Sequence, residues 1–172
     1  CGDRGRRRHR VRRRHLAREL RHLTQLRDTV VREAAAHKQR IKALLLLEGI
    51  GFPSATAGRQ WTLRVKAQLR KLRCSRTVRF KLDQLLDSLE FCEKQVVSST
   101  KEIRRFCKED VELFQSIEYL MSIPGIGWIV ASQLLARMGD WREIDNVRQL
   151  GSFLGLVPTE NSTGDSVDRG SI

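Results

Sequence analysis

Apolar side chains recur every three or four residues along two long stretches of the chain. The first stretch, from residue 16 to residue 44, has the positions Leu16, Leu20, Leu23, Arg27, Val30, Ala34, His37, Ile41 and Leu44. Alternating steps of four and three place these side chains in one stripe along a helix, with Arg27 and His37 as its polar interruptions. The Gly-Ile-Gly-Phe-Pro sequence at 49–53 predicts that this helix ends near Gly49.

The second stretch is more regular and follows a short helix predicted at about 60–73, with Trp61, Val65, Leu69 and Leu72 on one face. Its stripe consists of Val78, Leu82, Leu85, Leu89, Cys92, Val96, Ser99, Ile103 and Phe106, and Leu113 and Ile117 continue the count. The pattern predicts one helix of roughly 60 Å, at about 1.5 Å per residue. Because one long helix cannot bury its own stripe, it should pair with the first helix in an antiparallel hairpin or with another subunit.

A third pattern predicts two helices joined by a tight turn. A helix that ends near residue 122 is followed by Pro124, Gly125, Ile126 and Gly127, and then by apolar residues at helical spacing: Ile129, Val130, Leu134, Leu135 and Met138. The glycines permit the turn and leave the backbone amides of the second helix accessible, and with the helix dipole these amides form a phosphate site. The pattern predicts a helix-hairpin-helix that contacts nucleic-acid backbone, with few cations nearby, namely Arg137, Arg142 and Arg148. A plain turn between two helices is the alternative.

These patterns together predict an all-α fold: a long antiparallel helical coiled-coil hairpin followed by a small helical domain containing the helix-hairpin-helix. The composition agrees, because 40% of the residues are hydrophobic while only 6% are aromatic. The expected domains are an Arg-rich disordered arm at 1–15, a helical coiled-coil region at 16–118 and the small domain at 119–172.

The charge of the chain is unevenly distributed. Residues 1–47 carry 15 Lys and Arg against 4 Asp and Glu, a net +11, whereas residues 77–172 carry 11 against 15, a net −4. A basic half of this kind favours a polyanionic partner, most commonly nucleic acid. No apolar run approaches the roughly 18 residues of a membrane-spanning helix, so no membrane partner is expected.

The Arg-rich residues 1–15 have three interpretations: a disordered tail, a phosphate-binding arm, or a stretch of GC-rich gene read in a wrong frame. The four cysteines show no C-x-x-C spacing and the four histidines lack acidic or Cys companions, so we expect a reduced protein without a zinc site. The polar residues 159–172 are typical of a surface loop, and no His and Asp partners mark a hydrolase triad around their serines.

Residues 122–172 contain the blocks Pro-Gly-Ile-Gly, Gly-Asp-Trp, Phe-Leu-Gly-Leu-Val-Pro-Thr-Glu-Asn-Ser-Thr-Gly and Arg-Gly-Ser-Ile in this order. This stretch resembles the C-terminal transposase domain of the insertion sequence 110 family, whose members are DEDD-type, RNA-guided recombinases. Residues 16–121 resemble the central coiled-coil segment of that family. The resemblance therefore implies DNA transposition by site-specific recombination, with DNA, a guide (bridge) RNA and further copies of the chain as partners, in the bacterial cytoplasm at the nucleoid.

The resemblance also implies a two-part active site. An RuvC-like N-terminal domain binds Mg²⁺ through acidic residues, and the C-terminal domain supplies a serine that attacks a DNA phosphate. By its place in the motif Pro-x-x-x-Ser-[Ser/Thr]-Gly, Ser162 matches that serine, and Thr163 stands where many relatives carry a second Ser. Thr163, Gly164 and Arg169 are expected to contact nucleic acid, and no metal ligand or cofactor is expected within the chain itself.

Two departures from the family pattern define the expected role of the chain. Nothing before residue 16 resembles the acidic RuvC-like domain, and relatives continue beyond the residue that matches Ile172. The expectation is therefore a C-terminal transposase fragment, truncated at its own C-terminus. A non-catalytic helix-hairpin-helix nucleic-acid-binding protein and a coiled-coil scaffold are the alternatives. Binding that weakens steeply with salt distinguishes the former alternative from the latter, because a scaffold does not bind nucleic acid.

We predict that the isolated chain binds nucleic acid but does not cleave it, because a serine hydroxyl is a poor nucleophile without an activating base or metal. The measurement is incubation with Mg²⁺ and a DNA junction, followed by denaturing electrophoresis for a protein–DNA adduct. A covalent adduct formed by the isolated chain would contradict this expectation.

Overall fold

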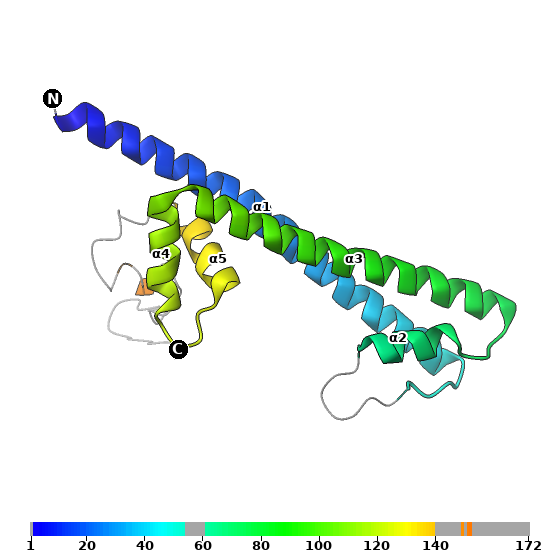
Figure 1. Cartoon of the computed structure of the whole chain (residues 1–172). Coiled ribbons are helices and arrows are strands. Elements are labelled where there is room, and N and C mark those ends of the chain that lie inside the picture. Colours follow the sequence, from blue (N-terminus) through cyan, green and yellow to red (C-terminus); the bar gives the residue numbers. More distant parts are fainter. Residues whose placement is uncertain (1, 54–60, 140–148, 150, 153–172) are drawn as a thin grey trace, which may run out of the picture. The chain divides into compact units, whose positions relative to one another are not determined.

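A computed structural model of the chain describes the backbone of residues 2–53, 61–139, 149 and 151–152, and the side chains from residue 9 onwards within these ranges. The regular structure in this part of the chain is helical: α1 (Gly2–Leu47), α2 (Leu63–Arg70), α3 (Arg76–Glu109), α4 (Val111–Met121) and α5 (Trp128–Met138) (Figure 1). The prediction of an all-α fold is confirmed.

The chain forms two compact units. Unit 1 consists of Cys1–His22 and Cys107–Ile172, and unit 2 consists of Leu23–Phe106. Unit 1 therefore combines segments from both ends of the sequence, whereas unit 2 is continuous. The division into segments 1–15, 16–118 and 119–172 stays a prediction about domains in the complete protein.

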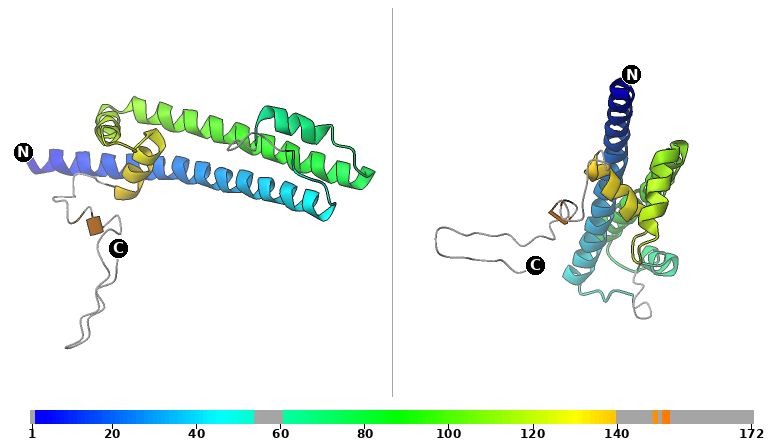
Figure 2. Two further views of the ribbon diagram at one scale, coloured as in Figure 1. Left: turned by 90° about the horizontal axis from the view of Figure 1, so that it is seen from below. Right: turned by 90° about the vertical axis from the view of Figure 1, so that its left-hand side faces the viewer.

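Unit 2 is built on the pairing of α1 with α3. In this unit the two helices lie side by side in the left view of Figure 2. Arg27 Nε donates a hydrogen bond to Thr100 Oγ1 at 3.0 Å, and Lys38 Nζ lies 3.4 Å from a carboxylate oxygen of Glu93. Because the higher-numbered residue of α1 meets the lower-numbered residue of α3, the helices run antiparallel here. Their description as a coiled coil and any pairing with another subunit stay predictions.

The predicted stripes form the core of unit 2. From α1 the core takes Val30, Ala34, Ile41, Leu44 and Leu45, and from α3 it takes Val78, Leu82, Leu86, Leu89 and Cys92. Arg27 at the first polar interruption is satisfied by Thr100, whereas His37 at the second has a buried Nδ1 without a hydrogen-bond partner. The periodicity thus identified the buried face of both helices.

One core residue of α3 was missed by the sequence pattern. Leu86 is fully buried, whereas Leu85, which the pattern favoured, is only half-buried. The reason is that α2 packs on α3 in addition to α1, so the buried stripe is wider than the two positions per heptad of a two-helix seam. Val65 and Leu69 of α2 are buried in this core, as predicted for the short helix.

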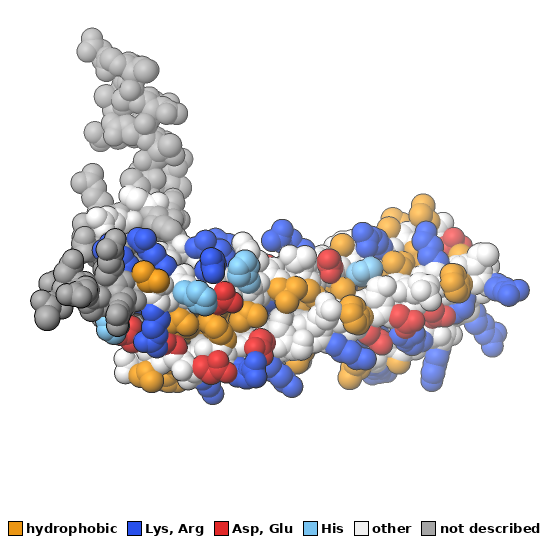
Figure 3. All heavy atoms as spheres, turned by 90° about the horizontal axis from the view of Figure 1, so that it is seen from above, with side chains coloured by type: hydrophobic (Ala, Val, Ile, Leu, Met, Phe, Trp, Pro, Cys, Tyr) orange, Lys and Arg blue, Asp and Glu red, His pale blue; other side chains and the backbone are white. Residues whose placement is uncertain are grey.

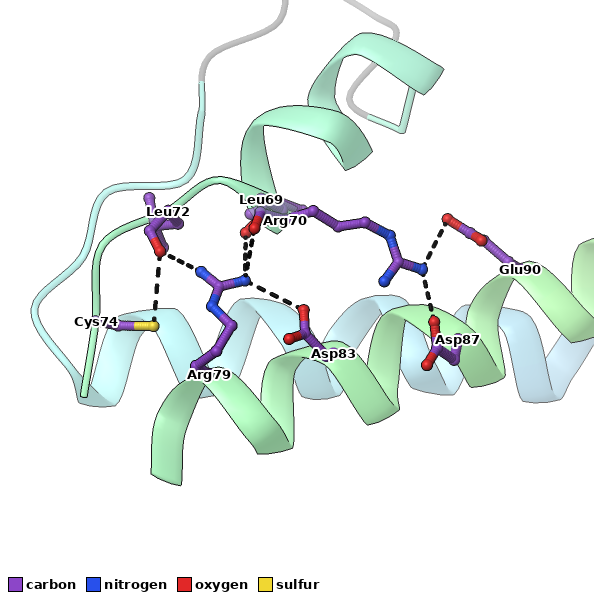
Figure 4. Close-up of polar contacts among 8 residues, drawn as sticks. All are labelled: Leu69, Arg70, Leu72, Cys74, Arg79, Asp83, Asp87 and Glu90. Atoms are coloured by element: carbon purple, nitrogen blue, oxygen red, sulfur yellow. Dashed lines mark hydrogen bonds and ion pairs between the residues drawn. The ribbon is translucent and has the colours of Figure 1, made fainter. Parts of the chain in front are cut away.

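Two arginines attach α2 to α3 (Figure 4). Arg79 donates to the carbonyl oxygens of Leu69 at 3.0 Å, Arg70 at 3.1 Å and Leu72, and so caps the C-terminal end of α2. Arg70 in turn donates to Asp87 at 2.7 Å and lies 3.2 Å from Glu90. The hydrogen bond that Arg70 donates to Asp87 raises the pKa of the Arg70 guanidinium. Side-chain donors thereby satisfy helix-end carbonyls that the short α2 cannot pair internally.

The C-terminal end of α1 lies where the sequence predicted it. The amide of Gly49 donates to Leu46 O at 3.1 Å and that of Ile50 to Leu45 O at 2.9 Å, while Gly49 has φ +65°. This pair of hydrogen bonds around a left-handed glycine is a Schellman motif. Ile50 and Leu45 also meet in the core of unit 2, which completes the motif with its hydrophobic contact.

The prediction of one helix running through Ile117 is wrong. α3 ends at Glu109, and Asp110 has an extended backbone, φ −116° and ψ 117°, as the N-cap of α4. Its carboxylate accepts a hydrogen bond from Leu113 N at 2.9 Å and forms an ion pair with Arg12. The apolar spacing continued across this break because Leu113 and Ile117 are also buried, although they are buried in unit 1 and not in the core of unit 2.

The N-terminal segment also differs from the expected disordered arm, because α1 begins at Gly2. Arginine has a high helix propensity, so an Arg-rich sequence forms a helix readily once its charge is compensated. That compensation comes from the start of α4, where Arg12 pairs with Asp110 and Arg13 lies 3.8 Å from Glu112.

We predict that Leu86→Ala lowers the free energy of unfolding by about 2–5 kcal/mol, because it leaves a cavity where α2 and α3 meet. Urea denaturation followed by circular dichroism measures the change. Leu46→Ala is the matched control: Leu46 is 81% exposed, and its truncation should change the stability by no more than about 0.5 kcal/mol. Equal effects of the two substitutions would contradict the assignment of Leu86 to the core.

Candidate nucleic-acid interface

The link between α4 and α5 is a tight turn that the local sequence encodes. The amide of Ile126 donates to Ile123 O at 3.1 Å, and between these residues Gly125 has φ +89°. Pro124 occupies the position that favours a fixed φ of about −65°, and Gly125 occupies the position that requires a positive φ, so the four residues match a type II turn. Any side chain at Gly125 would be strained by this backbone conformation.

The turn leaves the start of α5 open to solvent. Gly127 is the N-cap residue of α5, and because it lacks a side chain it makes no capping hydrogen bond to the first amides. Its carbonyl accepts the first helical hydrogen bond from Ala131 N at 3.0 Å. Pro124, Gly125 and Gly127 are exposed, and a Cβ atom built on either glycine would meet nothing within 4 Å. The first amides of α5 therefore face a space that an anion can enter.

Close packing of α4 against α5 supports this turn. Leu113 and Ile117 of α4 are fully buried in unit 1, as are Ala131, Leu135 and Ala136 of α5. The rings of Phe114 and Trp128 lie 6.1 Å apart between their centroids. The sequence pattern identified Leu135 correctly but assigned Val130 to the same face, and Val130 is 44% exposed. Alanines rather than large apolar residues line much of the contact face of α5.

The far end of α5 is capped from the N-terminal helix. Arg21 donates from Nε to Ala136 O at 3.0 Å and from Nη2 to Arg137 O at 3.3 Å. A cation at the C-terminal end of a helix opposes the negative pole of its dipole and leaves the positive pole at the N-terminal end intact. No local sequence pattern predicts this contact, because more than a hundred residues separate its partners.

The buried polar groups of unit 1 are structural rather than reactive. Ser132 is fully buried and donates to Trp128 O at 2.7 Å. Its Oγ lies 3.9 Å from Cys107 Sγ. Burial raises the pKa of the Cys107 thiol to about 11, so it stays protonated and unreactive at neutral pH.

The residues predicted to act at this site fall into two groups. The structure describes Pro124, Gly125, Ile126 and Gly127 and brings them together in one turn. The remaining predicted residues lie outside the described residues: Ser162, Thr163, Gly164 and Arg169, together with the cations Arg142 and Arg148. Arg137 is described, but it lies in the last turn of α5, at the opposite end from Gly127. The electropositive character that the described residues give to the start of α5 therefore comes from backbone amides and not from Arg137.

In the described part of the chain, no group of three or more His, Cys, Asp or Glu side chains could hold a metal ion. None of the helices in the described ranges combines the length and the apolar character that crossing a membrane demands.

Comparisons with known proteins connect this turn to a family. Residues 117–172, which begin within α4 and include the turn and α5, match the family model described as the Transposase IS116/IS110/IS902 family. The chain is 31% identical over 142 residues to a protein named transposase for insertion sequence element IS1328, from Yersinia enterocolitica, covering 83% of this chain and 40% of that protein.

Other relatives carry similar names. A protein of Pseudomonas aeruginosa named probable family 20 transposase is 34% identical over 91 residues, which cover 53% of this chain and 26% of that protein. The transposase for insertion sequence element IS1111A of Coxiella burnetii is 26% identical over 145 residues, covering 83% of this chain and 38% of that protein. The chain thus spans well under half the length of these relatives. No solved structure matches it.

Proposed function

We propose that this chain is part of a DNA transposase of the IS116/IS110/IS902 family, in which unit 1 supplies DNA-backbone contacts and a serine nucleophile. The observation that carries the proposal is the family match over residues 117–172, because it begins in α4 and includes the exposed turn and the uncapped start of α5. The names of the relatives, all transposases, point to the same reaction.

The turn contributes phosphate binding. Amides at the start of a helix carry partial positive charge, and the aligned peptide dipoles of α5 add to it. Gly127 places no side chain in front of these amides, so a phosphate oxygen can approach to hydrogen-bonding distance. Contacts of this kind position a protein on DNA without reading its bases.

The serine that we propose as nucleophile is Ser162, in the sequence Pro-Thr-Glu-Asn-Ser-Thr-Gly at 158–164. Its Oγ attacks the phosphorus of a DNA phosphodiester and gives up its proton. A phosphoserine ester forms as the bond to the leaving deoxyribose oxygen breaks, and that oxygen takes up a proton. Reversal of this step on another strand end rejoins the DNA, which is the exchange that recombination requires. Thr163, Gly164 and Arg169 are proposed to hold the same strand.

The partners in this proposal rest on family resemblance. Besides DNA, they include a guide RNA that selects the target and further copies of the chain that complete the recombining assembly. The proposed place of action is the bacterial nucleoid, where the DNA substrate is.

We predict that Gly127→Ala weakens the binding of the chain to short duplex DNA, because the added methyl group stands between the α5 amides and a phosphate. Its φ is not in the left-handed region and its Cβ meets nothing within 4 Å, so the fold should be retained. Gly127→Asp should weaken binding further by charge repulsion, while its carboxylate caps α5 and raises stability by a few tenths of a kcal/mol. Fluorescence anisotropy measures binding, and thermal melting measures stability.

Gly51→Ala is the matched control for this experiment. Gly51 is likewise exposed, has no positive φ and has space for a Cβ, but it lies in unit 2. Its binding should equal that of the unmodified chain. If Gly127→Asp bound DNA as tightly as Gly51→Ala, the α5 amides would not be a phosphate site.

We predict that Ser162→Ala, made in a complete transposase carrying this sequence, abolishes the covalent protein–DNA adduct and strand exchange while leaving DNA affinity within about 3-fold, since a group used only in the chemical step contributes little to ground-state binding. Ser166→Ala, four residues along the same segment, is the control and should exchange strands normally. Strand exchange by the Ser162→Ala protein would show that another group is the nucleophile.

A further inference from the structure

Unit 2 carries most of the positive charge of the chain. Its residues 23–106 contain 18 Lys and Arg against 8 Asp and Glu, a net +10, whereas the whole sequence has a net charge of +13. In the space-filling view of Figure 3, Lys and Arg side chains project from the surface, and Asp and Glu side chains lie among them. Ion pairs within the fold decide which of these cations are left for a partner.

Every carboxylate of α3 within unit 2 has a cation beside it, at a distance of 2.6 to 3.4 Å. The pairs are Asp83 with Arg79, Asp87 and Glu90 with Arg70, Glu93 with Lys38 and Lys66, and Glu102 with Arg105. Several of these cations also attach α1 or α2 to α3. The acidic side chains of this helix are therefore neutralised by cations that the fold itself uses.

Three other cations of the same helix are placed differently. Lys94, Lys101 and Arg104 are exposed. Among the described residues, no hydrogen bond or ion pair involves the side chains of these three. At 3.6 residues per turn, Lys101 lies about 20° and Arg104 about 80° around the helix from Lys94, so they share one side of α3. We call these three side chains the α3 basic face.

The charges of the α3 basic face do not favour the fold by themselves. Lys101 and Arg104 are three residues apart and are neighbours on the helix surface, where two like charges repel each other. Glu90, one turn before Lys94, could offset its charge, but Glu90 already pairs with Arg70 at 3.2 Å. An anion bound along this side of α3 would replace the repulsion by attraction. The α3 basic face therefore suits a ligand better than it suits the isolated fold.

The length of the α3 basic face suits a repeating anion. From Lys94 to Arg104 it extends over about 15 Å, at 1.5 Å per residue. One strand of B-DNA carries a phosphate about every 3.4 Å of its axis, so this length corresponds to about four phosphates. The Arg104 guanidinium can bind a phosphate through two parallel N–H groups, and the two lysines can each contribute a point charge with three donors.

We propose that Lys94, Lys101 and Arg104 form a surface that binds the phosphate backbone of a nucleic acid, separate from the amides at the start of α5. This inference rests on the proposed function for the presence of a nucleic acid, but it gives unit 2 a contact of its own. DNA and RNA share the phosphate chemistry that the α3 basic face recognises. A membrane fits less well, because an interfacial helix needs a broad apolar face, whereas Val97, 55% exposed, is a single apolar side chain between the two lysines.

The test compares the unmodified chain with the triple variant Lys94→Gln, Lys101→Gln and Arg104→Gln. Fluorescence anisotropy measures the affinity for short duplex DNA and for single-stranded RNA of the same length at several salt concentrations. Each lost phosphate contact makes the fall of log K with log salt shallower by about 0.9 for B-DNA and about 0.7 for a single strand. The triple variant should therefore bind more weakly between about 50 and 200 mM salt, with a fall shallower by up to about 2.7 on duplex DNA or about 2 on single-stranded RNA.

The control is a triple variant with the same change of net charge elsewhere in unit 2: Arg32→Gln, Arg40→Gln and Lys81→Gln. These three side chains are also exposed. The melting temperature of the α3 variant should equal that of the control or exceed it slightly, because the removed charges repel each other. A melting temperature well below that of the control would mean that the α3 basic face holds the fold together, and would overturn the inference.

The outcomes separate this inference from the proposed function. If the α3 variant keeps the salt dependence of the control while Gly127→Asp weakens binding, the α3 basic face is not a phosphate surface and the proposed function stands. If the unmodified chain binds neither DNA nor RNA, both fail. A loss of binding to anionic vesicles or to poly-glutamate, with nucleic-acid binding unchanged, would also overturn the inference. A larger loss on RNA than on DNA supports it and identifies RNA as the strand held by α3.

Discussion

The carboxylate of Asp110 is the group on which unit 1 depends. The backbone of Asp110 is extended, which ends α3. Its carboxylate caps α4 by accepting a hydrogen bond from Leu113 N and pairs with Arg12, although Asp110 is only 6% exposed. An N-cap of this kind is worth about 1 kcal/mol, and a buried carboxylate without its cation would cost several times more. The same ion pair compensates the positive charge of Arg12 in α1. Without this break α4 would continue the line of α3.

The arginines of α1 in unit 1 have different environments because different sides of the helix contact different elements. One side meets the acidic start of α4, and Arg21 meets the carbonyl end of α5. The side chains of Arg10, Arg14, Arg18 and His22 on the same helix are exposed. A sequence rich in a single residue type thus supplies helix-to-helix contacts and a charged surface together. The net +11 of residues 1–47 is therefore partly internal to the fold.

Unit 2 shows how a short helix becomes part of a long-helix framework. α2 has only 8 residues and leaves several carbonyls unpaired at its end. Arg79 donates to the carbonyls of Leu69 and Arg70 at this end and to that of Leu72 just beyond it, and Arg70 pairs with two carboxylates of α3. Burial of Val65 and Leu69 then widens the apolar stripe of α3 to include Leu86. The polar contacts place the helix, and the apolar contacts make the placement stable.

The sequence by itself determined the features that depend on neighbouring residues. The apolar spacing identified most of the buried face of α1 and α3, Gly49 ended α1, and the Pro124-Gly125 pair specified the turn that presents the start of α5. The tertiary structure decided the break at Asp110, the burial of Leu86, the exposure of Val130 and the cap that Arg21 gives α5. Periodicity shows which side of a helix is apolar, because that side follows from spacing alone. It does not show how many neighbours cover that side or which distant charge meets a helix end, because those contacts exist only after the chain has folded.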